Sequence, residues 1–246
     1  MTADEKTALA RLLDVAGAVV RGGYVEAFAD YRFEDSPEPE APPPGGGRGI
    51  CSDDSFEKLE ADIRGCTACR LSQERKNAVP GEGVRNPAVM VIGEGPGADE
   101  DESGRPFVGK AGQLLDKMLA AIGLSREENC FIANVVKCRP PGNRDPYPDE
   151  TAACAPFLER QARLLNPSFA LLAGRIACQS LLGTKESIGR IRGRVGRLEA
   201  AGLDVPFVAT YHPSALLRND EYKRPAWEDL KLLRSALEDS GFSGTE

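Results

Sequence analysis

Four cysteines in two parts of the chain have a spacing that suits a metal centre. Cys66 and Cys69 form a C-x-x-C pair, Cys138 follows a predicted strand, and Cys154 comes sixteen residues later. Four thiolates from two regions can close a tetrahedral zinc site or hold a 4Fe-4S cluster. The spacing does not separate these alternatives, and it also permits a redox dithiol at the C-x-x-C pair.

The other three of the seven cysteines are expected to bind no metal. Cys130 lies inside a predicted strand and Cys178 inside a predicted helix, so both are interpreted as buried thiols. Cys51 is expected to be a free thiol. An odd number of cysteines in a chain without an export signal also argues against a disulfide framework.

The single histidine, His212, comes directly after a predicted strand and before Pro213. An isolated histidine is usually structural, but at a strand end it can donate a hydrogen bond to a developing anion. Further along the same segment, Leu216 or Leu217 would supply an apolar wedge and Arg218 a phosphate contact. A zinc deaminase is excluded, because its H-x-E motif must precede the cysteines.

A glycine-rich loop, Gly93-Glu94-Gly95-Pro96-Gly97, follows another predicted strand. It fits a dinucleotide-binding fingerprint poorly, because Ala98 replaces the third glycine, Pro96 lacks an amide hydrogen and the four acids at 99–102 would repel phosphate. We interpret it as a tight loop that presents Glu94 and backbone amides to a small polar ligand. A plain strand-terminating turn would explain the glycines, but not Pro96 or the downstream GRPFVG.

These segments need a scaffold that brings the ends of strands together. Apolar runs typical of buried strands occur at 87–93, 130–136, 168–174 and 205–211, and helical spacing occurs at 111–122, 148–165, 175–182 and 227–237. The alternation predicts an α/β protein with a mainly parallel sheet covered by helices on both faces. In such sheets ligands bind beyond the carboxyl ends of the strands.

The composition changes near residue 50. Residues 1–33 are predicted to be a helical extension, residues 34–50 a linker of Pro, Gly and acid, and residues 51–246 the globular domain. With 246 residues, of which 41% are hydrophobic, the chain can build a sizeable core. No apolar run is long enough to cross a bilayer and the N-terminus lacks a basic start, so we expect a cytoplasmic protein that binds no membrane.

The formal net charge of −7 argues against a histone-like protein that holds nucleic acid through overall positive charge. A local positive face is still expected from the basic stretch 185–197 and from Lys137, Arg139 and Arg144. A solvated loop or surface hairpin without a partner is the alternative for 185–197.

Together, three motifs resemble those of the family 4 uracil-DNA glycosylases, which carry an iron-sulfur cluster. The motifs are GEGPGADEDESGRPFVGKAGQLLDKML, NVVKCRPPGNRDP and YHPSALLR, in this order and with the C-x-x-C ahead of them. The resemblance covers about residues 56–237. It implies a three-layer α/β/α sandwich around a four-stranded parallel sheet, which agrees with the four predicted strands. The implied reaction is hydrolysis of the N-glycosidic bond of a flipped deoxyuridine in DNA.

The resemblance also implies roles for the residues at the strand ends. Asn134 has the position that reads uracil through its amide, and Phe107 the position on which the base stacks. Glu100 falls where thymine's methyl group would be excluded. His212 would contact uracil O2, and the Gly95 amide could add a second donor.

Activation of water is expected to depend on Glu94. In relatives from other families an Asp or Asn follows this position, but here the next residue is Gly95, which has no side chain. Glu94 would therefore orient the water, with Asp101 behind it. No lysine is expected in the pocket motifs, so water rather than an amine should attack the sugar.

The resemblance favours a 4Fe-4S cluster over zinc, with a structural role and with Cys66, Cys69, Cys138 and Cys154 as ligands. Ser214, Leu216 and Arg218 are the expected DNA contacts. We expect a monomer that acts on single- or double-stranded uracil-containing DNA, with a helix in 1–33 that either binds a protein partner or packs on the domain.

The competing class is a non-enzymatic or inactive DNA-binding module of the same fold. A relative that traps DNA covalently is disfavoured, because no basic insertion or histidine follows Cys138.

Overall fold

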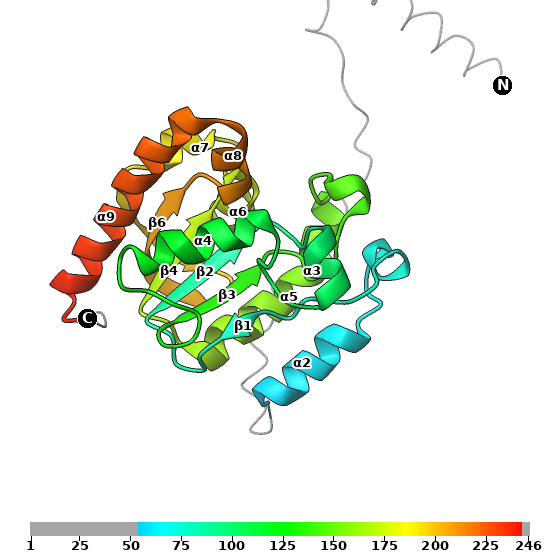
Figure 1. Ribbon diagram of the computed structural model, residues 1–246. Helices are drawn as coiled ribbons and strands as arrows, with labels where there is room; N and C mark the ends of the chain where they lie inside the picture. Colours follow the sequence, from blue (N-terminus) through cyan, green and yellow to red (C-terminus); the bar gives the residue numbers. More distant parts are fainter. Residues whose placement is uncertain (1–53, 243–246) are drawn as a thin grey trace, which may run out of the picture. The chain divides into compact units, whose positions relative to one another are not determined.

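The computed structural model describes residues 54–242 (Figure 1). The predicted helical extension at 1–33, the predicted linker at 34–50 and Cys51 lie outside the described residues, and so do the last four residues of the chain. The predicted boundary of the globular domain at residue 51 therefore stays a prediction.

A six-stranded sheet forms the middle layer of the described part. Its strands are β1 (Glu82–Gly83), β2 (Val89–Gly93), β3 (Cys130–Asn134), β4 (Phe169–Ala173), β5 (Val195–Ala200) and β6 (Leu203–Thr210), in the order β1-β3-β2-β4-β6-β5. The four central strands are parallel, which confirms the predicted core of the sheet. The outer strands β1 and β5, which the sequence pattern did not predict, pair antiparallel with β3 and β6.

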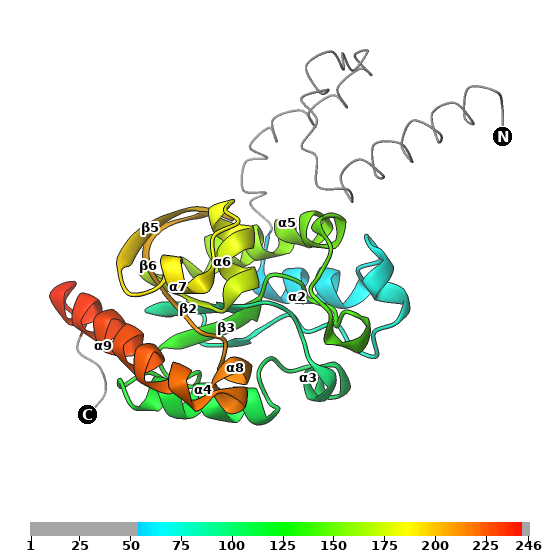
Figure 2. The same ribbon diagram turned by 90° about the horizontal axis from the view of Figure 1, so that it is seen from above.

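Helices cover both faces of this sheet and complete the predicted α/β/α sandwich (Figure 2). One face is covered by α4 (Lys110–Ala120), α8 (Pro213–Arg218) and α9 (Lys223–Asp239), and the other by α2 (Phe56–Gly65), α5 (Pro148–Leu165), α6 (Arg175–Leu182) and α7 (Ile188–Ile191). The short α3 (Ala98–Ser103) follows the glycine-rich loop. None of the described helices combines the length and the apolar character needed to cross a membrane.

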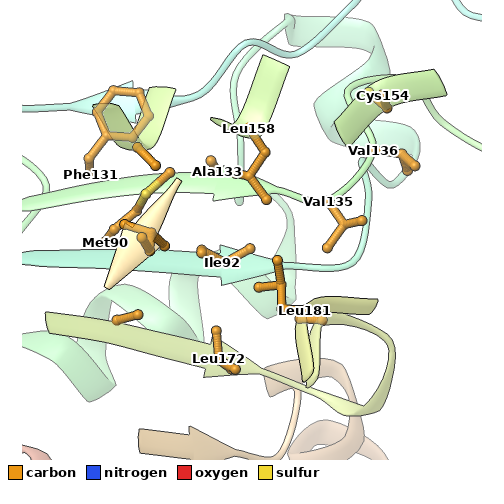
Figure 3. Packing of buried hydrophobic residues seen from close by; sticks show 14 of the residues in the cluster. Met90, Ile92, Phe131, Ala133, Val135, Val136, Cys154, Leu158, Leu172 and Leu181 are labelled. Carbon is orange, nitrogen blue, oxygen red and sulfur yellow. The ribbon is translucent and has the colours of Figure 1, made fainter. Parts of the chain in front are cut away.

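The core follows from the alternation of side chains along the central strands. Met90, Ile92, Phe131 and Ala133 pack towards α5, as Figure 3 shows, whereas the alternate residues Val89, Val91 and Ile132 pack towards α4 and α9. The central strands read as continuous apolar runs because both faces of the sheet are covered.

The strands β2, β3, β4 and β6 end at the same edge of the sheet. Gly93 at the end of β2 lies opposite Asn134 at the end of β3, and Ala173 of β4 lies opposite Thr210 of β6. The segments that leave these four strands therefore start side by side, as predicted.

The buried thiols are confirmed in the same core. Cys130 begins β3 and Cys178 lies in α6, and both are fully buried. Burial raises the pKa of each thiol to about 12, so neither is a thiolate at neutral pH.

Candidate active site

A cavity of about 670 Å³ lies at the carboxyl ends of the central strands. Its volume is typical of sites that bind small molecules, which measure about 300 to 1,000 Å³. Its lining includes eight of the ten residues predicted to act on substrate or DNA: Glu94, Gly95, Glu100, Phe107, Asn134, His212, Ser214 and Arg218. Asp101, Leu216 and the four cysteines are not among its lining residues.

Asn134 offers an unsatisfied acceptor to this cavity. Its side chain is 1% exposed, and its Oδ1 has no hydrogen-bond partner among the described residues. A buried acceptor without a donor is costly, so this atom is suited to receive a hydrogen bond from a ligand. Gly93 makes the arrangement possible, because a Cβ there would lie 2.5 Å from Asn134 Oδ1 and 2.6 Å from the Phe107 ring.

Phe107 is held in an unfavourable backbone conformation. Its φ of 52° lies in the left-handed region, which costs a residue other than glycine about 1 to 3 kcal/mol. The guanidinium of Arg126 holds this loop by donating hydrogen bonds to the carbonyl oxygens of Pro106 (2.9 Å) and Phe107 (3.0 Å). In this conformation the Phe107 ring lies 5.6 Å from the His212 ring, centroid to centroid.

His212 lies immediately before α8 and offers one defined proton. Its Nδ1 accepts a hydrogen bond from the backbone N–H of Ser214 (3.2 Å) and lies 2.8 Å from Ser214 Oγ. Burial, with a smaller effect of Arg218, lowers the pKa of the ring to about 4, so the ring is neutral at pH 7. A neutral ring that accepts at Nδ1 carries its proton on Nε2, which is therefore a donor.

Glu94 begins the segment after β2. Its backbone carbonyl accepts a hydrogen bond from the N–H of Val136 (3.1 Å), which ties this loop to the segment after β3. Burial and the nearby Asp145 carboxylate raise the pKa of Glu94 to about 7, against the opposing effect of Arg175. A carboxylate that ionises near neutral pH suits a general base.

Asp145 and Arg175 also line the cavity, although they were not among the residues predicted from the sequence. Arg175 Nη2 donates to Asp145 Oδ2 at 2.5 Å, and both side chains are about half exposed. Each stands in a segment that follows a central strand. The strand-end criterion that selected Glu94 and His212 could therefore have found them.

Glu100 connects the two loops that surround the cavity. Its Oε1 accepts hydrogen bonds from the backbone N–H groups of Val108 (2.9 Å) and Gly109 (3.0 Å). Its Oε2 accepts one from the N–H of Gly97 (3.0 Å). The carboxylate thereby joins the glycine-rich loop to the Phe107 loop, and exclusion of a methyl group by Glu100 stays a prediction.

Asp101, predicted as the second candidate for the catalytic carboxylate after Glu94, does not line the cavity. The side chain is 4% exposed, and its Oδ1 accepts hydrogen bonds from the backbone N–H groups of Lys76 (2.9 Å) and Asn77 (3.2 Å). The physical reason is helical geometry, because adjacent residues of α3 point in different directions. Asp101 fixes the segment after the C-x-x-C pair instead.

The prediction that Leu216 contacts DNA as an exposed wedge is also wrong. Leu216 is 3% exposed and packs in the core against α4 and α9. Its neighbour Leu217 is 51% exposed, because one helical step turns it out of the core. On the same helix Ser214 and Arg218 line the cavity.

Two expectations about lysine are wrong as well. Lys110, the first residue of α4, lines the cavity with an exposed side chain, although no lysine was expected in the pocket motifs. Lys137, expected on a positive surface, is 1% exposed. Its position in a polar motif suggested solvent, but the segment that follows β3 runs through the core at this point.

Part of the basic stretch 185–197 is engaged in ion pairs. Arg192 contacts Asp229 at 2.8 Å, and Arg197 contacts Asp204 at 2.6 Å. Three other cations of the stretch are exposed and have no ion-pair partner within the described chain: Lys185, Arg190 and Arg194.

The four predicted metal ligands come from four neighbouring segments. Cys66 follows α2, Cys69 precedes the short helix Arg70–Gln73, Cys138 follows β3, and Cys154 lies in α5. Burial raises the pKa of Cys154 to about 11, Lys137 acts against this rise, and the charges of Cys138 and Cys66 contribute to it. The four thiols are thus near enough to affect one another's ionisation.

Three of the four sulfur atoms already have N–H donors aimed at them. Arg75 Nη1 lies 2.9 Å from Cys138 Sγ, the backbone N–H of Lys137 donates to Cys154 Sγ at 3.2 Å, and the N–H of Ala68 donates to Cys66 Sγ at 3.4 Å. Such donors stabilise thiolates that bind metal, so the set is chemically suited to a metal centre.

Comparison with known proteins agrees with this geometry. The family model of the uracil DNA glycosylase superfamily matches residues 80–231. The chain is 44% identical to a type-4 uracil-DNA glycosylase of Pyrobaculum aerophilum over 181 residues, which cover 72% of this chain and 92% of that protein. Type-4 enzymes of Saccharolobus solfataricus and Thermotoga maritima are 42% and 41% identical, over 75% and 76% of this chain and 87% and 96% of their own.

The α/β/α fold, the cavity at its strand ends and the match over more than half of the chain define the class: the chain belongs to the uracil DNA glycosylase superfamily. Within that superfamily it belongs to the type-4 uracil-DNA glycosylases, because its similarity to them extends over most of both chains. The resemblance that the three sequence motifs carried is thereby confirmed.

Proposed function

We propose that this chain is a uracil-DNA glycosylase that hydrolyses the N-glycosidic bond of deoxyuridine in DNA and leaves an abasic site. The names of the type-4 relatives support the activity. The observation that carries the proposal is the buried Oδ1 of Asn134, which lines the cavity and has no donor among the described residues.

The Asn134 amide distinguishes uracil from cytosine. Uracil presents an N3–H donor and an O4 acceptor, which complement Oδ1 and the amide N–H groups. Cytosine presents the opposite pattern, so both of its contacts would be mismatched and the site's buried polar groups left unpaired. The Phe107 ring and the Asn134 side chain both lie close to the Cα of Gly93. The ring supplies the surface on which the base stacks.

His212 stabilises the departing base. As the glycosidic bond breaks, negative charge develops on uracil O2, and the Nε2–H of a neutral ring can donate a hydrogen bond to it. The ring need not transfer its proton, because burial keeps it neutral at physiological pH. The amide of Gly95, which also lines the cavity, adds a second donor.

Glu94 orients and deprotonates the attacking water. The sugar becomes oxocarbenium-like as the base leaves, so a water held by a carboxylate on the open face can add to C1′. Burial raises the pKa of Glu94 to about 7, with Asp145 adding to this effect and Arg175 opposing it. Lys110 at the rim is assigned a phosphate contact, since its exposed ammonium suits a backbone anion.

DNA binds through α8 and the exposed cations. Ser214 and Arg218 position the phosphates, and Leu217, the exposed one of the two leucines predicted as a wedge, takes that role. Lys185, Arg190 and Arg194 extend the positive surface without being neutralised by ion pairs within the described chain.

Cys66, Cys69, Cys138 and Cys154 hold a 4Fe-4S cluster in this proposal. Within residues 54–242 no three His, Cys, Asp or Glu side chains converge on a single-ion site. The N–H donors directed at three of the four sulfur atoms support the assignment. The cluster would cross-link α2, α5 and the segment after β3. No cysteine lines the cavity, so the cluster would have a structural role and take no part in the chemical steps.

An excision assay on uracil-containing oligonucleotides, single- and double-stranded, tests the activity. We expect free uracil and an intact strand with an abasic site, and no adduct after borohydride reduction. Binding without release of uracil would favour an inactive DNA-binding module, and a borohydride-trapped adduct would assign the attack to an amine, for which Lys110 is the candidate.

Metal analysis of anaerobically purified protein tests the cofactor. We expect a brown protein with about four irons and four sulfides per chain, as a cubane on four thiolates requires. One zinc without acid-labile sulfide would overturn the cluster while leaving the four ligands in place.

A further inference from the structure

Lys137 lies between Asn134, which would bind uracil, and the cysteine centre, by which we mean Cys66, Cys69, Cys138 and Cys154. Its Nζ donates hydrogen bonds to the backbone carbonyl of Asn134 (2.7 Å) and to Gln161 Oε1 (2.5 Å). Its own backbone N–H donates to Cys154 Sγ (3.2 Å), and its carbonyl accepts from the N–H of Val79 (2.7 Å). One residue therefore contacts both a metal ligand and the residue that would bind uracil.

The short chain between these two sites is tightly held. The N–H groups of Val135 and Val136 donate to the carbonyls of Gly93 (2.9 Å) and Glu94 (3.1 Å), so the segment cannot move without moving the first cavity loop. Figure 3 shows Val136 next to Cys154 at this point of the core. The segment from 134 to 138 thus connects the cavity to the cysteine centre through packed and hydrogen-bonded groups.

The charge of Lys137 needs an anion that no carboxylate supplies. Its side chain is 1% exposed, and it forms no ion pair with an acid of the described chain. An ammonium group buried without an anion is strongly unfavourable. Burial lowers the pKa of Lys137 to about 8, and negative charge on Cys154 and Cys138 acts in the opposite direction. Binding to a metal centre would keep both thiolates ionised.

We propose that Lys137 couples the iron-sulfur cluster to uracil recognition: the negative cluster thiolates hold the buried ammonium group in place, and the ammonium group holds the backbone of Asn134. This inference rests on the proposed function and on the cluster as its cofactor. Lys137 is a positioning residue, because it touches neither the substrate nor the reacting atoms. Asn134 is the residue through which it acts.

The variant Lys137→Met tests this coupling in the cluster-containing enzyme. Methionine fills similar space without a charge or a donor, so we expect free uracil to bind about 10- to 100-fold more weakly, as expected when a hydrogen bond from a charged donor is lost. Lys137→Arg keeps the cation and should restore part of the affinity. Lys76→Met removes an exposed lysine that pairs with Glu102 and serves as the matched control.

A measurement on the unmodified enzyme provides a test that does not depend on the folding of a variant. Coupling between two sites is reciprocal, so saturating uracil must shift the reduction potential of the cluster if the cluster affects uracil binding. We expect a reproducible shift in wild type and in Lys76→Met, and a smaller or absent shift in Lys137→Met.

The outcomes separate this proposal from the proposed function. If the enzyme excises uracil and contains iron, but uracil does not change the reduction potential of the cluster, the coupling is overturned. The proposed function then stands. Wild-type uracil affinity in a cluster-loaded Lys137→Met protein overturns the coupling as well. Failure of wild type to excise uracil would count against the function, and absence of iron in wild type would overturn both the cofactor and the coupling.

Discussion

Burial acts in opposite directions on the two ionisable side chains that the proposed reaction needs. It raises the pKa of Glu94 to about 7 and lowers the pKa of His212 to about 4, because in each case it disfavours the charged form. Above pH 7 the cavity therefore contains an anionic Glu94 and a neutral His212. This is the state in which one can activate water and the other can donate a hydrogen bond to the leaving base.

The pH dependence of excision should report Glu94. Single-turnover excision is expected to fall about tenfold for each pH unit below 7, because the base must be ionised, and to level off above pH 7. In the Glu94→Gln variant we expect a rate at least about a hundredfold lower and without this rise. A wild-type profile that is flat between pH 5 and 8 would assign water activation to another group.

Glu94 should also lower the stability of the fold at neutral pH. Its folded-state pKa, about 7, lies above the ordinary value of 4.5, so between these values the unfolded chain releases a proton that the folded chain retains. Stability is therefore lost as pH rises through this window. Thermal unfolding should give Glu94→Gln a higher Tm than wild type at pH 8 and a similar Tm at pH 4, and equal values at both would refute the burial effect.

Substitution of Asn134 by Asp should weaken the exclusion of cytosine. A buried carboxyl group tends to be protonated, and its O–H can donate to cytosine N3 where the amide oxygen would accept from uracil N3–H. We expect uracil excision to fall at least about tenfold and the uracil-to-cytosine ratio of rates to fall with it. An active variant that still excludes cytosine completely would remove Asn134 from the specificity role.

Most of the candidate site could be predicted from the types of residue that follow the strands. Asn134, Phe107 and His212 could be selected because each stands at or beside a motif that leaves a strand, and the cavity brings them together. Asp101 and Leu216 were misassigned because both lie in helices of six residues, which are too short to show which side faces the core.

At the scale of elements, the contact between α4 and the Phe107 loop shapes the cavity. A Cβ at Gly112 would lie 1.9 Å from the Phe107 carbonyl oxygen, so α4 can approach this loop only with glycine at that position. The approach and the Arg126 hydrogen bonds together maintain the left-handed Phe107 backbone.

The variant Gly112→Ala is therefore expected to displace Phe107. Overpacking of this kind costs about 1 to 3 kcal/mol, which denaturant unfolding would measure, and excision should fall at least about tenfold with the ring misplaced. Gly189→Ala in α7 is the control, since the nearest atom to a Cβ there is 4.0 Å away. Equal stability and activity of the two variants would contradict the role given to Gly112.

Long and regular elements could be predicted from the sequence, whereas short or half-exposed ones could not. The bounds of α5 and α6 coincide with the helical spacing at 148–165 and 175–182. In contrast, β1 has only two residues, and β5 has a single buried side chain, so neither gives the apolar run of a buried strand. Arg126, which donates to the Phe107 carbonyl, and Arg75, which donates to Cys138 Sγ, could not be predicted either. Both reach their partners through tertiary contacts, which a local sequence pattern does not show.

At the scale of the molecule, the described unit contains the complete cavity and all four predicted cluster ligands. Near the start of the described residues, Asp54 forms an ion pair with Arg160 at 2.6 Å.

A truncated chain that starts at Ile50 should therefore excise uracil from short oligonucleotides at close to the full-length rate. A loss of more than about tenfold, equivalent to roughly 1.4 kcal/mol in the barrier, would show that the removed segment belongs to the catalytic domain. Iron content and Tm of the two forms, measured in parallel, separate such a loss from incomplete folding.

The two antiparallel outer strands have a consequence for the behaviour of the protein at high concentration. A parallel sheet with bare edges presents unpaired backbone groups on which another chain can build. Here one edge ends in a strand of two residues, and the other ends in β5, where Arg197 and Glu199 are exposed. Neither edge offers a long apolar template, so the fold is protected against the edge-to-edge association by which β-sheet proteins aggregate.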